Sequence, residues 1–262
     1  MIDLLLVNPG NGEKMYQSLA SEYRSIEPPW WCGILASFVR RYHYDVQILD
    51  ADADNLSPNQ TAKKIGDYKA KLIAIVVQGC NPSASSTPKM SAVRDILEDL
   101  YPNEAPIVLV GLHPSALPER TLKEEKCDYV VVGEGFYTLL DMLMSINLFH
   151  KVNENLIRGL AYLDCKGKKV IFTKPSELLS GELLPPVTWD LLDMKKYRAP
   201  TWPCLGRDIE NRSPHGVIYS SLGCPFSCEI CNVKTLYNGK SGIRYRSIKS
   251  VIDEIDLLVN KY

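Results

Sequence analysis

Five short apolar runs divide the first half of the chain. They cover Ile2–Val7, Val46–Leu49, Leu72–Val77, Ile107–Val110 and Tyr129–Val132. Each run is almost continuously apolar and does not alternate with polar residues, which is typical of parallel strands whose two faces are both buried. The pattern therefore predicts that these runs are neighbouring strands of one buried sheet.

The segments between these runs carry apolar residues at helical spacing. The clearest stripe extends from Trp31 to Tyr42, and weaker ones predict helices over Met90–Leu100, Pro118–Glu125 and Phe136–Asn147. Another helix is expected after Ser57-Pro58-Asn59-Gln60, which reads as a capping box with proline at the first helical position. Because strands and helices alternate, we predict an α/β fold with a doubly wound, flavodoxin-like parallel sheet over residues 1–147.

The second half of the chain has a different pattern. Residues 148–212 are expected to form a connector containing a β-hairpin, since the apolar runs Leu160–Leu163 and Val170–Thr173 flank Cys165-Lys166-Gly167-Lys168. Residues 213–262 begin a further unit, in which the apolar run Val217–Tyr219 predicts a strand. A helix should follow Ser247, because the residues after it place an apolar stripe on one face: Ile248, Val251, Ile252, Ile255, Leu258 and Val259.

The carboxyl ends of the predicted parallel strands are rich in glycine. In open α/β sheets a ligand binds outside these ends, and glycine lets the backbone approach it closely. A single such loop reads as an ordinary tight turn, but four together favour a ligand site. Its candidate contacts are Asn8, Gly10, Gln78, Asn81, Gly111, His113, Ser115, Gly133, Glu134 and Gly135.

Three cysteines lie close together between the predicted strand and helix of the last unit. Cys224, Cys228 and Cys231 have the spacing Cys-x-x-x-Cys-x-x-Cys, so one short loop can direct three thiolates at one metal centre. An iron–sulfur cluster normally has four protein ligands, and a set of three leaves one iron open for another molecule. The alternative is a structural zinc site completed by Cys204 or His215.

Composition narrows the class of protein. The net charge is −1, from 30 basic and 31 acidic residues, and does not indicate a nucleic-acid partner. The N-terminus has no signal-peptide pattern, and no apolar run reaches the roughly 20 residues of a membrane span. We therefore expect a cytoplasmic protein in a reducing compartment, where clustered cysteines indicate metal binding more than disulfides.

The cysteine motif resembles that of radical S-adenosylmethionine enzymes. The usual pattern has an aromatic residue before the third cysteine, where this chain has Ile230. The resemblance implies a 4Fe–4S cluster on the three cysteines, S-adenosylmethionine at the open iron, and a partial (β/α) barrel of which the last unit is the first βα repeat. Further βα units are expected in the family, so the chain reads as a fragment of a longer enzyme or a truncated product.

A second resemblance covers residues 1–147. The Pro28-Pro29 pair, the segment Gly111–Glu119, and Asp128 with the Gly133-Glu134-Gly135 loop are similar to the N-terminal cobalamin-binding domain of cobalamin-dependent radical S-adenosylmethionine enzymes. The Asp-x-His-x-x-Gly motif that supplies a lower histidine ligand in other cobalamin proteins is absent. His113 does not fit that motif, and it is either a cofactor contact or a helix-capping or loop residue.

Together the resemblances imply an enzyme that cleaves S-adenosylmethionine reductively and transfers a methyl group to an unactivated carbon. Oxidative cyclisation or ring rearrangement is the alternative within the family. The implied partners are a small-molecule substrate and an electron donor such as flavodoxin or ferredoxin. A different class stays open: a non-catalytic cobalamin- or nucleotide-binding module with a structural metal site.

Overall fold

A seven-stranded sheet forms the centre of the molecule. The computed structural model describes residues 1–10, 24–79, 82–200 and 212–262, with only the backbone for 82–86. The strands lie in the order β2-β1-β3-β4-β5-β6-β7, and the first five are mutually parallel. This is the flavodoxin-like order, so the predicted fold class is confirmed. The five strands are β1 (Leu4–Asn8), β2 (Val46–Asp50), β3 (Leu72–Val77), β4 (Ile107–Gly111) and β5 (Tyr129–Val131).

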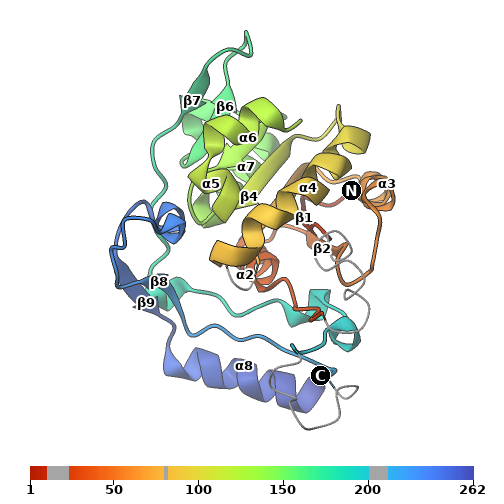
Figure 1. Ribbon diagram of the computed structural model, residues 1–262, viewed down its shortest axis with the longest axis vertical. Helices are drawn as coiled ribbons and strands as arrows, with labels where there is room; N and C mark the ends of the chain where they lie inside the picture. Colours follow the sequence, from red (N-terminus) through yellow and green to blue (C-terminus); the bar gives the residue numbers. More distant parts are fainter. Residues whose placement is uncertain (11–23, 80–81, 201–211) are drawn as a thin grey trace.

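Helices cover both faces of the sheet (Figure 1). Alternate residues of a strand point to opposite faces, and accordingly Leu4 and Leu6 belong to one apolar cluster while Leu5 and Val7 belong to the other. The first cluster packs against α2 (Trp30–Arg40) and α7 (Phe136–Phe149). The second packs against three helices: α3 (Pro58–Tyr68), α4 (Pro82–Leu100) and α6 (Pro118–Glu124). The near-continuous apolar runs are thus explained by burial on both sides.

Two helices differ from the prediction. The capping box at Ser57 is present, with the Ser57 hydroxyl accepting from Gln60 N and Gln60 Oε1 accepting from Ser57 N. However, α4 begins at Pro82, eight residues before the predicted start at Met90, and it contains Pro88. A short helix, α5 (Leu112–Ala116), also occupies part of the segment predicted as a loop after β4.

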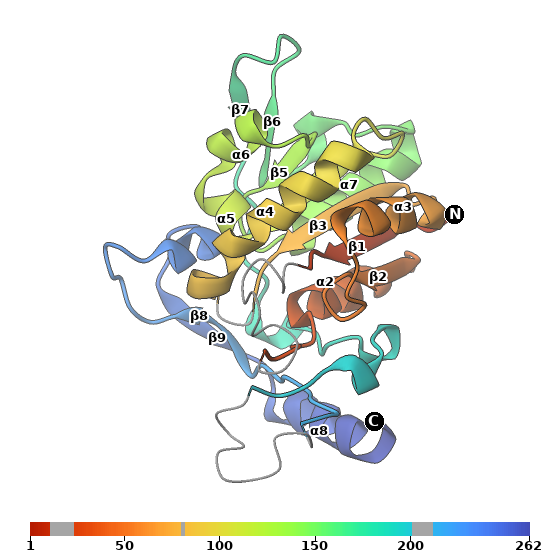
Figure 2. The ribbon, with the colours of Figure 1, turned by 45° about the vertical axis from the view of Figure 1, so that its right-hand side comes forward.

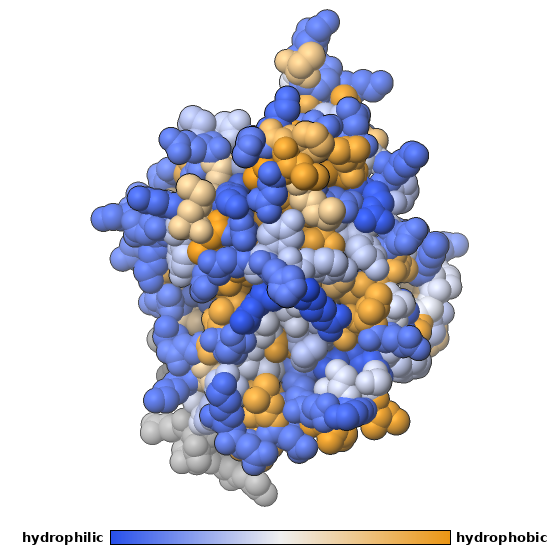
Figure 3. Space-filling view, turned by 180° about the vertical axis from the view of Figure 1, so that it is seen from behind, coloured by the Kyte–Doolittle hydropathy of each residue, from blue (hydrophilic) through white to orange (hydrophobic). Residues whose placement is uncertain are grey.

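The predicted hairpin exists and extends the main sheet. Its strands are β6 (Leu160–Leu163) and β7 (Val170–Phe172), and β6 pairs antiparallel with β5. The hairpin tip protrudes from the body of the molecule (Figure 2). Seen from behind, most of the surface is hydrophilic, with a patch of apolar residues just below this tip (Figure 3).

Short 3-10 helices interrupt the rest of the connector. η2 (Glu154–Leu156) precedes the hairpin, and after β7 the chain continues through η3 (Gly181–Leu183), η4 (Trp189–Leu191) and η5 (Met194–Lys196). Trp189, Leu184 and Tyr197 from this stretch are buried in the same apolar cluster as α2 and α7. The connector is therefore part of the core packing and contributes to the carboxyl edge of the sheet.

The strand of the last unit lies a few residues later in the sequence than predicted. The run 217–219 is not a strand; β8 lies instead at Ser221–Cys224 and pairs antiparallel with β9 (Gly242–Tyr245). Between them lies the 3-10 helix η7 (Asn232–Tyr237), and α8 (Ile248–Lys261) follows β9. The Ser247 hydroxyl caps α8 by accepting from Ser250 N, as predicted. Most of the apolar stripe of α8 is solvent-exposed.

No helix among the described residues has both the length and the apolar content needed to cross a membrane.

Candidate functional site

The carboxyl ends of β1 and β2 carry a buried polar network. Asn8 Nδ2 donates to Asp50 Oδ1 at 2.7 Å, and Lys89 Nζ from α4 donates to Asn8 Oδ1 at 2.6 Å. The Tyr197 hydroxyl donates to Asp50 Oδ2 at 2.9 Å. Burial raises the pKa of the Asp50 carboxyl, while the hydrogen bond from Asn8 opposes that shift. Since both polar atoms of the Asn8 amide are engaged within the protein, this predicted contact residue has a structural role in the network.

Gln78 lies at the carboxyl end of β3, where the strand order reverses between β1 and β3. Its Oε1 accepts from Leu112 N at 3.0 Å, which ties the end of β3 to the start of α5. Its Nε2 is buried but has no hydrogen-bond partner within the described part of the chain. A buried donor without a partner is costly and uncommon in native proteins. Gln78 is thus the residue of this edge that best fits an acceptor group on a ligand.

Gly111 ends β4 in a conformation that requires glycine. Its φ is +123°, and a Cβ at this position would lie 2.3 Å from the carbonyl oxygen of Val77. The close approach joins the ends of β3 and β4. At the other end of the site, Gly10 packs against the backbone of Ala51, whose carbonyl oxygen would be 2.9 Å from a Cβ. These glycines therefore bring strand ends together. Another predicted contact, Asn81, lies outside the described residues.

His113 is half-buried in α5, next to α4. Its Nδ1 lies 3.1 Å from the Thr87 hydroxyl, which fixes the orientation of the ring. Burial lowers the pKa of His113, and the nearby positive charge of Arg120 lowers it further. The imidazole is therefore kept neutral, with one nitrogen held by Thr87.

The lowered pKa of His113 predicts a pH dependence of stability. The unfolded chain binds a proton at His113 near the ordinary pKa of 6.5, whereas the folded chain does so only at lower pH. The free energy of unfolding should therefore fall as the pH drops below that value. We expect His113→Gln to flatten this part of the profile, measured by urea denaturation between about pH 7 and pH 5. The matched control is His150→Asn, at an exposed histidine; an unchanged slope in His113→Gln would contradict the assignment.

Ser115 and the Gly133–Gly135 loop are bound to each other. The Ser115 hydroxyl donates to Val131 O at 3.1 Å and accepts from Gly133 N at 3.1 Å. Gly133 and Gly135 have positive φ values of +118° and +94°. Between them, the Glu134 carboxylate is buried and forms an ion pair with Arg244 of β9. Burial raises the pKa of Glu134, and the Arg244 guanidinium offsets part of the shift. Ser115 and Glu134 therefore have partners inside the protein.

The three cysteines of the motif lie on the loop that joins β8 to η7. Cys224 is the last residue of β8, and Cys231 immediately precedes η7. All three are free thiols; Cys228 is exposed, and Ile230, which immediately precedes Cys231, is 98% exposed. Within the described ranges, no three His, Cys, Asp or Glu side chains are grouped as metal ligands. The donor set fits an iron–sulfur cluster, and such a loop commonly takes its final geometry only when metal binds.

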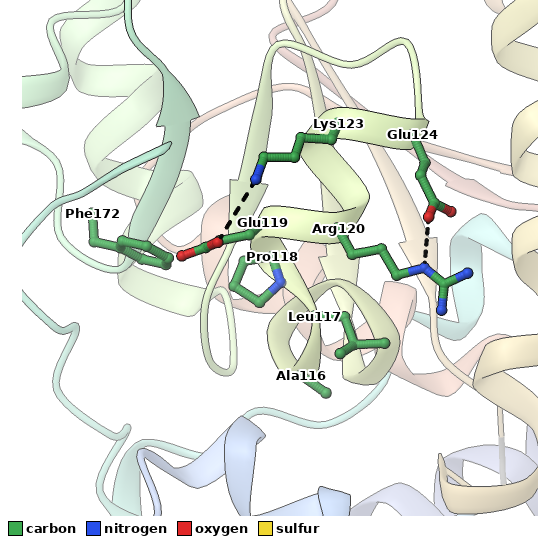
Figure 4. Close-up of a pocket in the computed structure, with 8 residues that line it drawn as sticks. All are labelled: Ala116, Leu117, Pro118, Glu119, Arg120, Lys123, Glu124 and Phe172. Atoms are coloured by element: carbon green, nitrogen blue, oxygen red, sulfur yellow. Dashed lines mark hydrogen bonds and ion pairs between the residues drawn. The ribbon is translucent and has the colours of Figure 1, made fainter. Parts of the chain in front are cut away.

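Two side chains of this region, Lys89 and Arg244, were not predicted from the sequence. Lys89 and Arg244 reach Asn8 and Glu134 across 81 and 110 residues. Neither belongs to a motif, so only the three-dimensional fold identifies them. A surface cavity of about 580 Å³ between α6 and β7 has none of the predicted contacts in its lining, and the charged side chains that line it pair with one another, Arg120 with Glu124 and Lys123 with Glu119 (Figure 4).

Sequence comparison identifies a domain model and known proteins that this chain resembles. Residues 16–143 match the B12-binding domain model. An uncharacterised methyltransferase of Pyrococcus horikoshii is 31% identical over 237 residues, covering 90% of this chain and 46% of that protein. The anaerobic magnesium-protoporphyrin IX monomethyl ester cyclase of Rubrivivax gelatinosus is 26% identical over 250 residues, covering 94% of this chain and 42% of that protein.

A solved structure supports the fold across nearly the whole chain. The radical S-adenosylmethionine methyltransferase TsrM of Kitasatospora setae, with cobalamin and a [4Fe-4S] cluster bound, has a TM-score of 0.65 at 18% identity. The match covers 98% of this chain and 46% of TsrM, and the chain likewise spans less than half the length of the two curated relatives. Residues 16–143 therefore match a B12-binding domain, and the chain has a fold similar to that of cobalamin-dependent radical S-adenosylmethionine enzymes.

Proposed function

We propose that this chain is the cofactor-binding portion of a cobalamin-dependent radical S-adenosylmethionine enzyme. Cobalamin would bind at the carboxyl edge of the sheet, and Cys224, Cys228 and Cys231 would hold a 4Fe–4S cluster. When bound, a reduced cluster supplies the electron that cleaves S-adenosylmethionine, and cobalamin supplies a methyl carrier. The single observation that carries the proposal is the unpartnered Nε2 of Gln78, buried at the strand ends of a B12-binding domain.

The reaction that we propose is methyl transfer to an unactivated carbon of a small-molecule substrate, with an electron donor such as flavodoxin or ferredoxin. Two of the similar proteins are methyltransferases by name, and a third is named an anaerobic magnesium-protoporphyrin IX monomethyl ester cyclase. Cyclisation is therefore the second candidate. Both reactions would use the same residues described here, because Gln78 and the cysteine loop serve the cofactors and not the substrate.

Gln78 provides a direct test of the cobalamin site. We expect Gln78→Met to weaken cobalamin binding about tenfold, because the side chain loses its free donor, while the stability of the cofactor-free protein changes little. Loss of the Leu112 hydrogen bond and removal of an unsatisfied buried donor act in opposite directions on stability. Titration with cobalamin, followed by tryptophan fluorescence, measures the affinity.

Asn8→Ala serves as the contrasting variant. Both amide atoms of Asn8 are bound to Asp50 and Lys89, so this change should lower stability and leave cobalamin affinity close to that of the wild type. A wild-type chain that does not bind cobalamin would contradict the proposed function. Equal affinities of wild type and Gln78→Met would contradict the role of Gln78.

Anaerobic reconstitution with iron and sulfide tests the second cofactor. We expect a 4Fe–4S signal in electron paramagnetic resonance that S-adenosylmethionine perturbs, because three thiolates leave one iron open. Tight zinc binding without a cluster would instead support the non-catalytic module.

A further inference from the structure

The Gly133–Gly135 loop is one of the places where the B12-binding sheet meets the unit that carries the cysteines. Arg244 of β9 reaches Glu134 with two nitrogens, Nη1 lying 3.0 Å from Oε2 and Nη2 contacting Oε1. Arg244 Nη1 also donates to Leu179 O at 2.6 Å, and Leu179 N donates to Glu134 Oε2 at 3.1 Å. The carboxylate is 3% exposed and the guanidinium 19%, so this two-pronged ion pair is largely shielded from water.

Arg244 is directly coupled to the cysteine loop through the β8–β9 ladder. In this antiparallel pair, Arg244 lies opposite Leu222 and Gly242 lies opposite Cys224. The position of the first cysteine is thus set two residues along the strand from the ion pair. Any shift of Arg244 relative to the sheet moves the backbone of Cys224 with it, because a hydrogen-bonded ladder transmits its register.

The other end of the cysteine loop is attached to the same place. η7 starts directly after Cys231 and packs against α5, as both ribbon views show. Tyr237 at its end places its ring 5.5 Å from the Arg244 guanidinium carbon. Asn238 then donates from Nδ2 to Ser176 O at 2.7 Å, and its Oδ1 would lie 3.5 Å from a Cβ at Gly133. Both flanks of the loop therefore rest on the Gly133–Gly135 turn.

From this arrangement we infer that Glu134 is a positioning residue and not a cofactor contact. Through Arg244 it fixes the cysteine loop against the carboxyl edge of the B12-binding sheet, and so sets the distance between the two proposed cofactor sites. Both carboxylate oxygens already accept from protein donors. The glycines on either side provide the positive φ values that let this turn receive η7 closely. The inference rests on the proposed function for the identity of the cofactors.

The test uses the full chain with three variants. Glu134→Gln keeps the size of the side chain but removes its charge, and Arg244→Lys keeps the charge but loses the two-pronged geometry. Glu119→Gln, at an exposed ion pair of α6, is the matched control. Hydrogen exchange of residues 221–245 is measured without cobalamin, and then cobalamin affinity is measured by titration.

We expect exchange in residues 221–245 of Glu134→Gln to accelerate roughly tenfold or more, since a buried charge partner is lost. Arg244→Lys should show a smaller acceleration in the same residues, and Glu119→Gln none. The affinity of Glu134→Gln for cobalamin should stay within about twofold of the wild type. A merely stabilising pair would instead lower protection throughout the sheet, α3 and α4 included, and that result would overturn the positioning role.

The inference and the proposed function fail in different ways. A tenfold loss of cobalamin affinity in Glu134→Gln, with exchange of residues 221–245 unchanged, would show Glu134 to be a ligand contact and overturn the inference. Wild-type protein that binds no cobalamin would contradict the proposed function alone, because the exchange measurement requires no cofactor. The cluster gives a further readout: in reconstituted wild type, cobalamin should alter the electron paramagnetic resonance signal, and Glu134→Gln should reduce that response. An equal response in both proteins would also overturn the inference.

Discussion

Replacing Cys228 with alanine is expected to remove nearly all of the iron and sulfide that the reconstituted chain retains. Three thiolates leave one of the four irons without a protein ligand, whereas two would leave two irons open to solvent and to exchange. Cys228 is the exposed member of the motif, so its loss should not disturb the fold. Iron and sulfide analysis of anaerobically prepared protein, with electron paramagnetic resonance after reduction, measures the effect.

Cys165→Ala is the matched control for this substitution. Cys165 is also an exposed free thiol, but it lies in the β6–β7 hairpin, outside the motif. We expect it to retain the iron content and the S-adenosylmethionine-dependent change in the signal. If Cys228→Ala kept a full cluster, or if both variants lost iron equally, the assignment of Cys224, Cys228 and Cys231 as the ligand set would be wrong.

The strands of the sheet were predictable because burial on both faces leaves a strong local signal. Four of the five predicted runs match β1 to β4 within two residues at each end, and β5 ends one residue earlier than expected. The doubly wound parallel sheet was predictable because strands and helices alternate along the chain. Helix α3 was equally clear, since in its capping box the side chains of Ser57 and Gln60 each accept from the backbone N–H of the other.

The errors have physical causes of their own. The start of α4 was predicted eight residues too late, because residues 82–89 are nearly all small or polar and carry no apolar stripe. The run 217–219 is apolar because Tyr219 is buried against Trp30, with its hydroxyl donating to Pro185 O, and not because it is in a strand. Apolar residues show burial, and three of them do not distinguish a strand from an extended connector.

The candidate site was likewise predicted in part: its position followed from local patterns, but the roles of its residues did not. The sequence identified the strand ends correctly as the polar, glycine-rich edge, and it identified Gln78 as part of it. It did not separate Gln78, whose amide nitrogen stays unpaired, from Asn8 and Glu134, whose polar atoms are used within the protein. That distinction depends on Lys89 and Arg244, which approach only after folding. Local patterns predict which residues are polar and buried; distant partners decide which of them are free to bind.

A second large effect is expected at the ion pair between Arg246 and Glu254, which joins the end of β9 to α8. Both side chains are 1% exposed or less, and Arg246 Nη1 lies 2.5 Å from Glu254 Oε2. Glu254 Oε1 also accepts from Val187 N and Trp189 Nε1 of the connector. We expect Arg246→Met to lower the free energy of unfolding by about 3–5 kcal/mol, because it leaves the Glu254 carboxylate buried without a countercharge. Urea denaturation at neutral pH measures the loss.

A double variant separates the buried charge from the lost packing. If the uncompensated carboxylate causes the loss, then Arg246→Met combined with Glu254→Gln should be more stable than Arg246→Met alone, since the amide carries no charge and still accepts from Trp189. Equal stability of the single and double variants would point to packing instead. Lys249→Ala, which breaks an exposed pair with Asp253 in the same helix, should cost far less, because water screens charges at the surface. The contrast between two pairs of one helix therefore tests whether burial, and not charge pairing itself, fixes α8 to the connector.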